Sequence, residues 1–515
     1  MPFPPTPEQS AIMEALNGAS SFGPSIMVEA GAGCAKTTTL ELASQNVRAP
    51  ALAVAFNKRI ADEMGKRLPG NFICKTMNSL GHAAWGRFTG LNLRLDDRKI
   101  GKLISEVARG RRMDLTSDQW DTTRLLIREA QIQGLVPRQH ETEASLIPDT
   151  PEGWSSLLSS SSADIDLADF EFVWEIAREV LARSIDLARA GVVSFDDQIY
   201  CSTMLGGRFG KFPVLFVDED QDLNPLQIQM LSLSTRPDTK LMAVGDKHQS
   251  IYAFRGAVGE AAEQIRLLRP QWTDLPLMTS FRVPQLVALR QRAHVPLFRA
   301  HGANPAGRIK VFSGEAGWSW QDVVDNLPEP DSPIAILCRN NSPIISMAFK
   351  LIRQGIGCFI LGRDISKGLV ALTKKLSPAD DTPSDTIRGR IREWQASEES
   401  KASANDKPEL IERIVDKAEC LIAVLDGSEA KDAGQLRRQL DRLFSRENGL
   451  VALSTIHRAK GLEWPAVLHL DPWRIPSKFA RGNDRAMAQE ANLRYVCETR
   501  TKHTLLLGSI EDFHP

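Results

Sequence analysis

The chain has 515 residues, too many for one hydrophobic core, and at about 150 residues per domain this length predicts roughly three or four domains. An apolar content of 42% is typical of globular domains. The 63 Lys and Arg and 64 Asp and Glu give a net charge of −1, which excludes a global attraction to a polyanion, so any nucleic-acid site must be local.

The cysteines and the N-terminus predict the compartment. Seven cysteines, scattered without metal-ligand spacing, indicate free thiols in a reducing environment. The start, MPFPPTPEQS, lacks a basic and apolar signal, and no apolar run approaches the ~18 residues that span a bilayer. We therefore expect a cytoplasmic protein with no membrane partner.

The first predicted strand, SIMVEA, leads into the loop VEAGAGCAKTT at 28–38, before a helical stretch. Small residues let backbone N–H groups close around phosphate oxygens at a helix N-terminus, where Lys36 would meet the terminal phosphates and Thr37 would ligate Mg²⁺. The pattern G-x-x-x-x-G-K-[ST] has glycine where this chain has Ala30 and Ala35, so a Gly-rich turn is the alternative. Cys34 is interpreted as a small filler. The predicted nucleotide-binding residues of the loop are Ala30, Gly31, Ala32, Gly33, Cys34, Ala35, Lys36, Thr37 and Thr38.

A second strand, ALAVAF, precedes residues 85–205, which are mostly helical in pattern with a Ser-rich break at 155–162. The strands FPVLFVDED and KLMAVGD, separated by LQIQMLSL, then continue the parallel-sheet pattern. Residues 85–205 are therefore predicted to be an insertion.

The strand VLFVDEDQD, at 214–222, delivers a cluster of acids at its C-terminal end, where open α/β sheets place ligands. Asp218 would hold magnesium, and Glu219 would orient and deprotonate the attacking water, because phosphoryl transfer needs metal charge and a positioned nucleophile. The alternative is an acid-rich loop after a buried strand.

A second α/β unit is predicted from about residue 276, with strands at 334–339, 358–362, 451–457 and 466–470. Residues 377–446 are charged and then amphipathic, which predicts a second, small helical insertion. Two nucleotide-type sheets would place ATP in a cleft between them.

Taken in order from residue 6 to about 508, the motifs resemble those of superfamily 1 DNA helicases of the UvrD/Rep type. VGDKHQSIYAFRGA, at 244–257, resembles the third motif, with Asp246, Gln249 and Arg255 at matching positions. The resemblance implies that Gln249 senses the γ-phosphate and that Phe254 stacks on a DNA base. Ordinary core packing of Phe254 is the alternative.

Further motifs complete the nucleotide site that the resemblance implies. Gln9 would read the adenine edge, although it also suits a solvated helix start, and Phe281 would cover adenine. Glu463, in LSTIHRAKGLEWPAV, would contact the ribose. Arg282, in TSFRVPQ, and Arg500, in QEANLRYVCETRT, would be the arginine fingers that stabilise charge on the transferring phosphoryl group.

Other motifs resemble the family's DNA-contacting segments, in which aromatic rings stack on bases and polar groups meet phosphates. That combination suits single strands, and its affinity should fall with salt. One departure is Asn78, where the family usually has histidine. The residues that the resemblance places on DNA are Phe56, Asn57, Lys58, Thr76, Ser79, His82, Phe254, Arg339, Asn340, Thr455 and His457, with Lys460 in the AKG turn.

The resemblance implies an α/β fold of two RecA-like P-loop NTPase domains, each with a mainly helical insertion. We expect the first domain at 1–84 and 206–275 with its insertion at 85–205, and the second at 276–376 and 447–515 with its insertion at 377–446. DEDQD and GRDISKGL look closer to the F-box helicase and phage branch than to the large bacterial enzymes.

The implied function is an ATP- and Mg²⁺-dependent helicase that moves 3′ to 5′ on single-stranded DNA and acts at junctions with duplex. Three alternatives stay open: a DNA-stimulated ATPase that remodels protein–DNA complexes with little unwinding, a P-loop kinase of a small molecule, and a DNA-binding module without catalysis.

Overall fold

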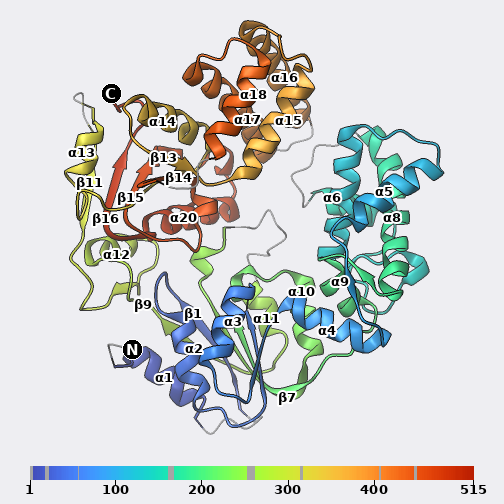
Figure 1. Ribbon diagram of the computed structural model, residues 1–515. Coiled ribbons are helices and arrows are strands. Elements are labelled where there is room, and N and C mark those ends of the chain that lie inside the picture. Colours follow the sequence, from blue (N-terminus) through green and yellow to red (C-terminus); the bar gives the residue numbers. More distant parts are fainter. Residues whose placement is uncertain are drawn as a thin grey trace. The chain divides into compact units, whose positions relative to one another are not determined.

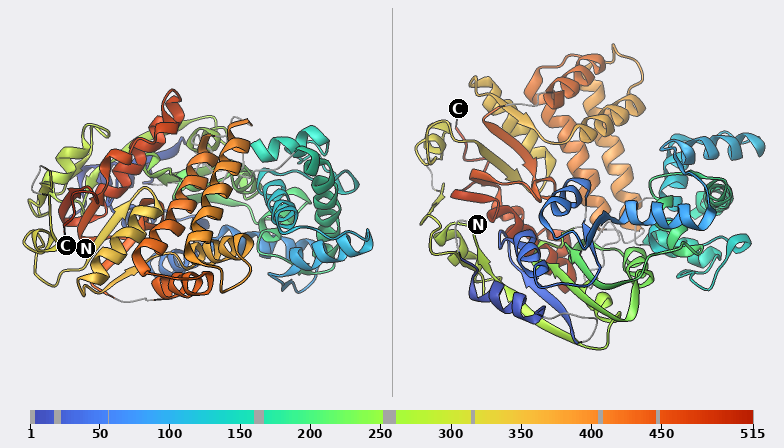
Figure 2. Two further views of the ribbon diagram at one scale, coloured as in Figure 1. Left: turned by 90° about the horizontal axis from the view of Figure 1, so that it is seen from above. Right: turned by 60° about the horizontal axis from the view of Figure 1, so that its bottom comes forward.

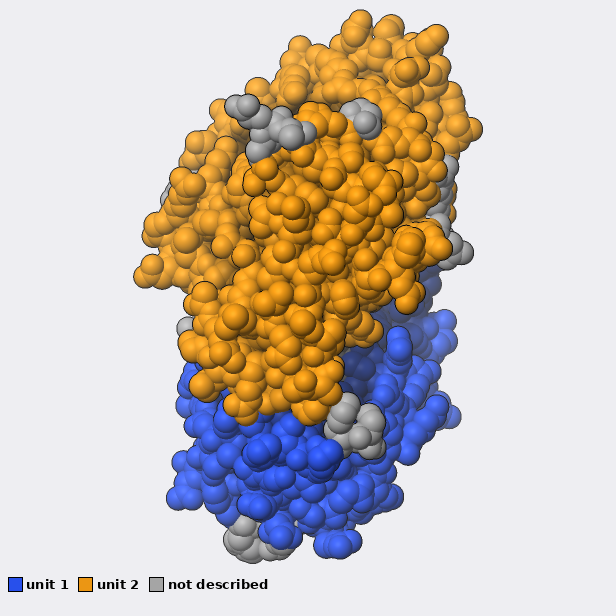
Figure 3. Space-filling model, turned by 90° about the vertical axis from the view of Figure 1, so that its left-hand side faces the viewer, with its two compact units in different colours: residues 1–31, 35–277 blue, residues 32–34, 278–515 orange. Residues whose placement is uncertain are grey.

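The computed structural model describes residues 4–17, 23–55, 57–159, 167–251, 261–313, 317–404, 408–445 and 449–514. The chain forms two compact units (Figure 3). Unit 1 contains residues 1–31 and 35–277, and unit 2 contains residues 32–34 and 278–515.

Unit 1 is built on a six-stranded parallel sheet (Figure 1). Its inner strands are apolar runs buried on both faces, as expected for a parallel sheet covered by helices. The strands, in spatial order, are β3 (Phe72–Thr76), β2 (Ala51–Ala55), β6 (Phe212–Asp218), β7 (Thr235–Gly245), β1 (Ser25–Ala30) and β8 (Trp272–Leu277). The predicted strands β1, β2, β6 and β7 are confirmed, whereas β3 and β8 add unpredicted edges. The accompanying helices are α1 (Pro7–Ala15), α2 (Lys36–Ser44), α3 (Lys58–Arg67), α10 (Pro225–Leu233) and α11 (Ala261–Arg266), with short 3₁₀ turns η2 (Asp220–Asp222) and η3 (Lys247–Gln249).

The region between β3 and β6 is mainly helical, as its pattern predicts. A buried ion pair joins Lys99 Nζ to Asp197 Oδ2 at 2.6 Å, and Gln131 and the Ser194 N–H also donate to that carboxylate. A buried charge pair is tolerated because these hydrogen bonds satisfy it. The elements are α4 (Met77–Thr89), β4 (Arg94–Leu95), α5 (Lys99–Gly110), α6 (Ser117–Gln133), η1 (Arg138–His140), α7 (Pro151–Ser159), α8 (Leu167–Arg189), β5 (Val192–Val193) and α9 (Asp197–Met204).

Unit 2 holds a second six-stranded parallel sheet, and α17 of its helical segment packs against α14 (Figures 1 and 2). The strands, in spatial order, are β11 (Arg308–Val311), β16 (Thr501–Gly508), β15 (Trp464–Leu470), β12 (Ile334–Cys338), β14 (Val451–Thr455) and β13 (Cys358–Ile360). Beside them lie the strand pair β9 (Thr279–Ser280) and β10 (Arg299–Ala300), helices α12 (Gln285–Gln291), α13 (Trp320–Val324), α14 (Asn341–Arg353), α15 (Arg363–Leu376), α19 (Ile456–Ala459) and α20 (Asp484–Glu498), and turns η5 (Pro472–Arg474) and η6 (Lys478–Ala480). The helical segment consists of α16 (Ser384–Ala404), α17 (Pro408–Ser428) and α18 (Ala433–Ser445).

Two further findings bear on the predicted compartment. Among the described residues, no helix combines the length and apolar character needed to cross a membrane. The seven cysteines all lie in the described part of the chain and form no disulfide.

Candidate functional site

The loop between β1 and α2 has the backbone of a phosphate-binding turn. Ala35, which precedes the first residue of α2, adopts the left-handed conformation with φ 58° and ψ 44°. Gly33 also has a positive φ, at 71°. The turn is therefore kept at Ala35 although the usual glycine is missing. The left-handed conformation costs an alanine on the order of 1–2 kcal/mol.

The acids after β6 lie next to this loop because β6, β7 and β1 are neighbours in the sheet. Lys36 Nζ forms an ion pair with Glu219 Oε2 at 2.7 Å, and Gln221 Nε2 donates to the same oxygen at 2.6 Å. Glu219 itself is left-handed, with φ 55°. The structure thus brings the predicted lysine and the predicted base into direct contact.

A hydrogen-bonded path runs from Glu219 to the predicted γ-phosphate sensor. Gln221 Oε1 accepts from the Asp246 N–H at 2.9 Å, and Gln249 Nε2 donates to Asp246 Oδ2 at 2.6 Å. The loop after β6 can approach the end of β7 this closely because residue 245 is glycine, since a Cβ on Gly245 would lie 1.7 Å from an Asp220 carboxylate oxygen. Gln221, which sequence reasoning missed, therefore links the loop after β6 to the loop after β7.

Burial dominates the electrostatics of this edge. It raises the pKa of Asp218 to about 7, with a further contribution from the Glu219 charge. Burial also raises the pKa of Asp220 to about 7. For Lys36, burial lowers the pKa, but the charges of Glu219, Asp246 and Asp218 outweigh it and leave the pKa above its ordinary value.

Thr37 and Asp218 are the predicted Mg²⁺ ligands, and each carries an oxygen of the kind that Mg²⁺ prefers. No group of three or more His, Cys, Asp or Glu able to hold a metal occurs among the described residues. Mg²⁺ commonly uses one or two protein oxygens and completes its shell with water and substrate phosphates. A divalent cation would also compensate the buried Asp218 carboxylate, and its binding would release a proton near neutral pH.

Asp218→Asn should stabilise the metal-free protein more at pH 8 than at pH 5. The carboxyl group has a folded pKa near 7 and an unfolded pKa near 4, so the native state binds more protons between these values and stability falls as pH rises through them. Asparagine removes this penalty while its amide oxygen can still accept from the Glu219 N–H. Melting curves of both proteins at both pH values measure this stability difference, with a rise in melting temperature of roughly 2–4 °C expected for each kcal/mol of destabilisation that the substitution removes. An equal melting temperature of the two proteins at pH 8 would contradict the buried charge.

Residues Ala32–Cys34 of the loop belong to unit 2. The Ala32 N–H donates to the Tyr495 hydroxyl at 2.8 Å, and the Phe281 N–H donates to the Gly33 carbonyl at 2.9 Å. A Cβ on Gly33 would lie 2.6 Å from Arg282 Cβ, so Arg282 sits directly against this part of the loop.

The Arg282 guanidinium is incompletely satisfied. Its Nε and Nη2 atoms are buried and have no hydrogen-bond partner among the described residues. Nη1 lies 3.5 Å from Glu463 Oε2, and Glu463 also pairs with Lys502. Buried, unpaired donors of a cation are costly, which indicates a site made for an anion.

The second predicted finger is placed differently. Arg500 is 1% exposed, and its Nε donates to the Val496 carbonyl at 2.9 Å. Its Nη1 lies 3.5 Å from the Leu462 carbonyl. The guanidinium is therefore held by the backbone of unit 2.

Phe281, the predicted adenine cover, stacks on His301 with a centroid distance of 4.8 Å.

Gln9 and Arg339 both have protein partners at the groups for which ligand contacts are predicted. Gln9 is fully buried, with its amide oxygen accepting from the Thr6 N–H and its nitrogen donating to Thr39 Oγ1, both at 3.0 Å. An amide has two N–H donors and two acceptor lone pairs, so these two bonds do not by themselves exclude an adenine contact. Arg339 is engaged by Glu490 at 2.7 Å and by Glu412, so carboxylates hold the group that was expected on DNA phosphate. The backbone N–H groups that begin α14, after Asn340, are likewise occupied by a carboxylate of α17.

The predicted DNA residues of unit 1 occupy two helix N-termini at one sheet edge. Asn57 caps α3 by accepting from the Ile60 N–H, and Thr76 caps α4 by accepting from the Ser79 N–H. These helices follow the adjacent strands β2 and β3, and helix N-termini favour anions. His82 lies on α4, and its Nδ1 atom is 3.1 Å from Gln198 Nε2.

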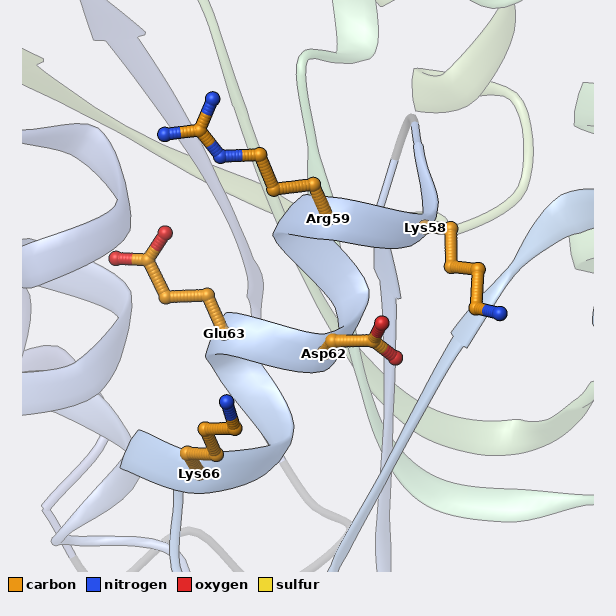
Figure 4. Close-up of a pocket in the computed structure, with 5 residues that line it drawn as sticks. All are labelled: Lys58, Arg59, Asp62, Glu63 and Lys66. Atoms are coloured by element: carbon orange, nitrogen blue, oxygen red, sulfur yellow. The ribbon is translucent and has the colours of Figure 1, made fainter.

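Helix α3 presents a mixed-charge pocket beyond its cap (Figure 4). The residues that line it are Lys58, Arg59, Asp62, Glu63 and Lys66. The side chain of Lys58, predicted near the DNA backbone, belongs to this face. Phe56, Phe254 and Arg255 lie outside the described residues.

Asn78, the departure from the family pattern, holds an aromatic segment in place. Its Nδ2 donates to the Phe195 carbonyl at 2.9 Å, and Phe195 is 57% exposed. Sequence reasoning missed Phe195 because nothing in SFDDQIY distinguishes an exposed ring from a core one. In unit 2, Thr455 is the buried last residue of β14 and the N-cap of α19, and His457 lies on that helix.

Comparison with known families assigns both units. The UvrD/REP helicase N-terminal domain family matches residues 11–266, and the UvrD-like helicase C-terminal domain family matches residues 387–512. The chain belongs to the UvrD/Rep helicase family. The two UvrD-type matches fall in units 1 and 2 respectively.

Individual relatives of this UvrD/Rep chain include F-box and bacterial helicases. F-box DNA helicase protein 1 of Schizosaccharomyces pombe is 26% identical, covering 98% of this chain and 57% of its own length. The ATP-dependent DNA helicase UvrD2 of Mycobacterium tuberculosis is 26% identical, covering 94% and 76%. F-box DNA helicase 1 of Gallus gallus is 24% identical, covering 98% and 49%. The chain thus spans about half of the length of the F-box relatives and three-quarters of that of UvrD2.

Proposed function

We propose that this chain is an ATP-dependent, Mg²⁺-dependent DNA helicase that translocates 3′ to 5′ on single-stranded DNA and unwinds duplex at single-strand junctions, as an intracellular, DNA-associated protein. The observation that carries the proposal is the Arg282 guanidinium against Gly33 of the phosphate loop, because its Nε and Nη2 atoms are buried with no hydrogen-bond partner among the described residues. Cationic donors aimed at a transferring phosphoryl group are the main catalytic device of ATPases.

The proposed chemistry is supported by the position of its groups near the C-terminal ends of β1, β6 and β7. Lys36 exchanges Glu219 for a phosphate oxygen, which leaves Glu219 to take a proton from the attacking water. Gln249 reports the γ-phosphate to Glu219 through Asp246 and Gln221. Thr37 and Asp218 would hold Mg²⁺, which would supply positive charge to offset the phosphates.

Two assays test the proposal and separate it from its runner-up. ATPase activity with and without an unstructured single strand shows whether turnover depends on DNA. Strand displacement on duplexes with a 3′ or a 5′ tail shows polarity and unwinding. DNA-stimulated turnover without displacement would favour a remodelling ATPase, and turnover indifferent to DNA would exclude both readings.

Truncation of the stacking aromatics should weaken DNA binding selectively. Phe254→Ala and Phe195→Ala should each lose about 1–3 kcal/mol of single-strand affinity, the range of base stacking, while DNA-free ATPase changes little. Phe88→Ala is the control, because Phe88 is also exposed but stacks on Trp85 of its own helix at 5.1 Å. Fluorescence anisotropy titrations with a labelled oligonucleotide measure the single-strand affinity of each variant. If Phe254→Ala lowers melting temperature, ATPase and displacement together, Phe254 is a core residue instead.

A further inference from the structure

The loop that follows β15 has an unusual composition for this chain. Between Asp471 and Asp484 the sequence is PWRIPSKFARGN, with three cations, two aromatic rings and no acid. The whole protein has a net charge of −1. A short segment in which cations alternate with aromatic rings is the composition that binds single-stranded nucleic acid.

Trp473 is exposed, yet its ring is ordered by its neighbours. It is 60% exposed, and the Arg474 guanidinium lies over the ring at 4.6 Å from the centroid. Arg474 Nε donates to Asp471 Oδ2 at 2.9 Å, and the buried Asp471 carboxylate also accepts from the Ile510 N–H at 2.8 Å. An exposed tryptophan held in one orientation loses little entropy when a planar partner stacks on it.

The rest of the loop is anchored to the body of unit 2. The Ser477 N–H donates to Glu490 Oε2 and its hydroxyl donates to Glu412 Oε2, both at 3.0 Å. Those two carboxylates are therefore turned toward Ser477 and Arg339. A second ring, Phe479, lies 4.9 Å from Lys478 Nζ, and both Lys478 and Arg481 are exposed.

The loop also lies at the sheet edge where DNA residues are predicted. Strand β15 pairs with β12, which pairs with β14, all in parallel. The residues that directly follow their C-terminal ends, Asn340 and His457 among them, therefore share one edge with Trp473. This edge is where open parallel sheets bind ligands.

We propose that residues 472–481 form a further single-strand binding segment, in which Trp473, oriented by Arg474, stacks on a nucleic-acid base and Lys478 and Arg481 meet backbone phosphates. The proposal rests on the proposed function and adds a contact site to it. A protein partner is the competing occupant of an exposed tryptophan, but the flanking residues are cationic, and cations next to a ring match a polyanion with stacked bases better than an apolar surface.

The test measures single-strand affinity and its salt dependence on the full chain. Trp473→Ala should weaken binding to labelled oligo(dT) by about 5- to 150-fold, the equivalent of ~1–3 kcal/mol, and Trp473→Phe should retain most of the affinity. A Lys478→Gln, Arg481→Gln double variant should reduce the slope of log affinity against log salt by roughly 0.7 per lost phosphate contact. The control is Lys310→Gln, which removes an exposed cation on edge strand β11 and should change neither the single-strand affinity nor the salt slope.

Two readouts keep the outcomes distinct. DNA-free ATPase and melting temperature should match wild type in all variants, because the changed side chains are exposed and outside the nucleotide residues. If wild type binds no single strand, the proposed function fails. If wild type binds and Trp473→Ala binds equally with the same salt slope, this inference alone is overturned, and a protein partner becomes the occupant of the ring.

Discussion

Glu219→Gln is expected to stop ATP hydrolysis while leaving ATP binding intact, whereas Lys36→Ala should lose the binding itself. Removing a general base costs about 10²- to 10⁴-fold in kcat. Lysine at this position instead contributes ground-state contact with the phosphates, which an alanine cannot replace. Titration with a fluorescent ATP analogue, together with steady-state turnover, separates the two effects.

The ion pair sharpens this prediction. Lys36 Nζ and Glu219 Oε2 are 2.7 Å apart, so a nucleotide must compete with the carboxylate for the ammonium group. Glutamine cannot form that ion pair, and Glu219→Gln should therefore bind ATP at least as tightly as wild type. Glu29→Gln is the matched control, since Glu29 pairs with Lys247 at 2.7 Å at the end of β1 and has no predicted catalytic role. An equal loss of nucleotide affinity in Lys36→Ala and Glu219→Gln would refute Glu219 as the base.

The central strands were predictable because each is an apolar run that ends in glycine or acids. β1, β6 and β7 are buried on both faces, so the sequence needs no polar alternation there. The edge strands were not predicted. β8 contains Asp274 and Pro276 and pairs only with β1, and a proline is tolerated at such an edge because one side of the strand makes no ladder.

The same contrast holds for the site. Lys36, Glu219 and Gln249 are close because their strands are adjacent, which local patterns and the family resemblance together indicate. The partners of Gln9 and Arg339 come from Thr39 and from Glu490, 30 and 151 residues away, and local sequence carries no sign of such contacts. Gln221 was missed for the same reason, since its contact with Asp246 joins residues 25 positions apart.

The two fingers should have equal importance for catalysis and opposite effects on stability. Arg282→Ala and Arg500→Ala are each expected to lower kcat by ~10³-fold or more, the range seen when an arginine finger is removed. Arg282 has buried donors without described partners, so its removal should leave the melting temperature unchanged or raised. Arg500 Nε donates to the Val496 carbonyl at 2.9 Å, so alanine there removes a buried hydrogen bond, leaves that carbonyl with the longer 3.4 Å bond from Thr499 Oγ1, and should lower the melting temperature.

Turnover and thermal melting measured on the same preparations decide between a catalytic and a structural role. Arg308→Ala, on edge strand β11, controls for the loss of an exposed arginine in unit 2. Arg282→Lys adds a finer test, because lysine keeps the charge but not the planar set of donors, and should recover only part of kcat. Slow turnover in Arg500→Ala that is fully explained by unfolding would reduce Arg500 to a structural residue. Wild-type turnover in a folded Arg500→Ala or Arg282→Ala variant would exclude that arginine as a catalytic residue, because turnover would then not need its charge.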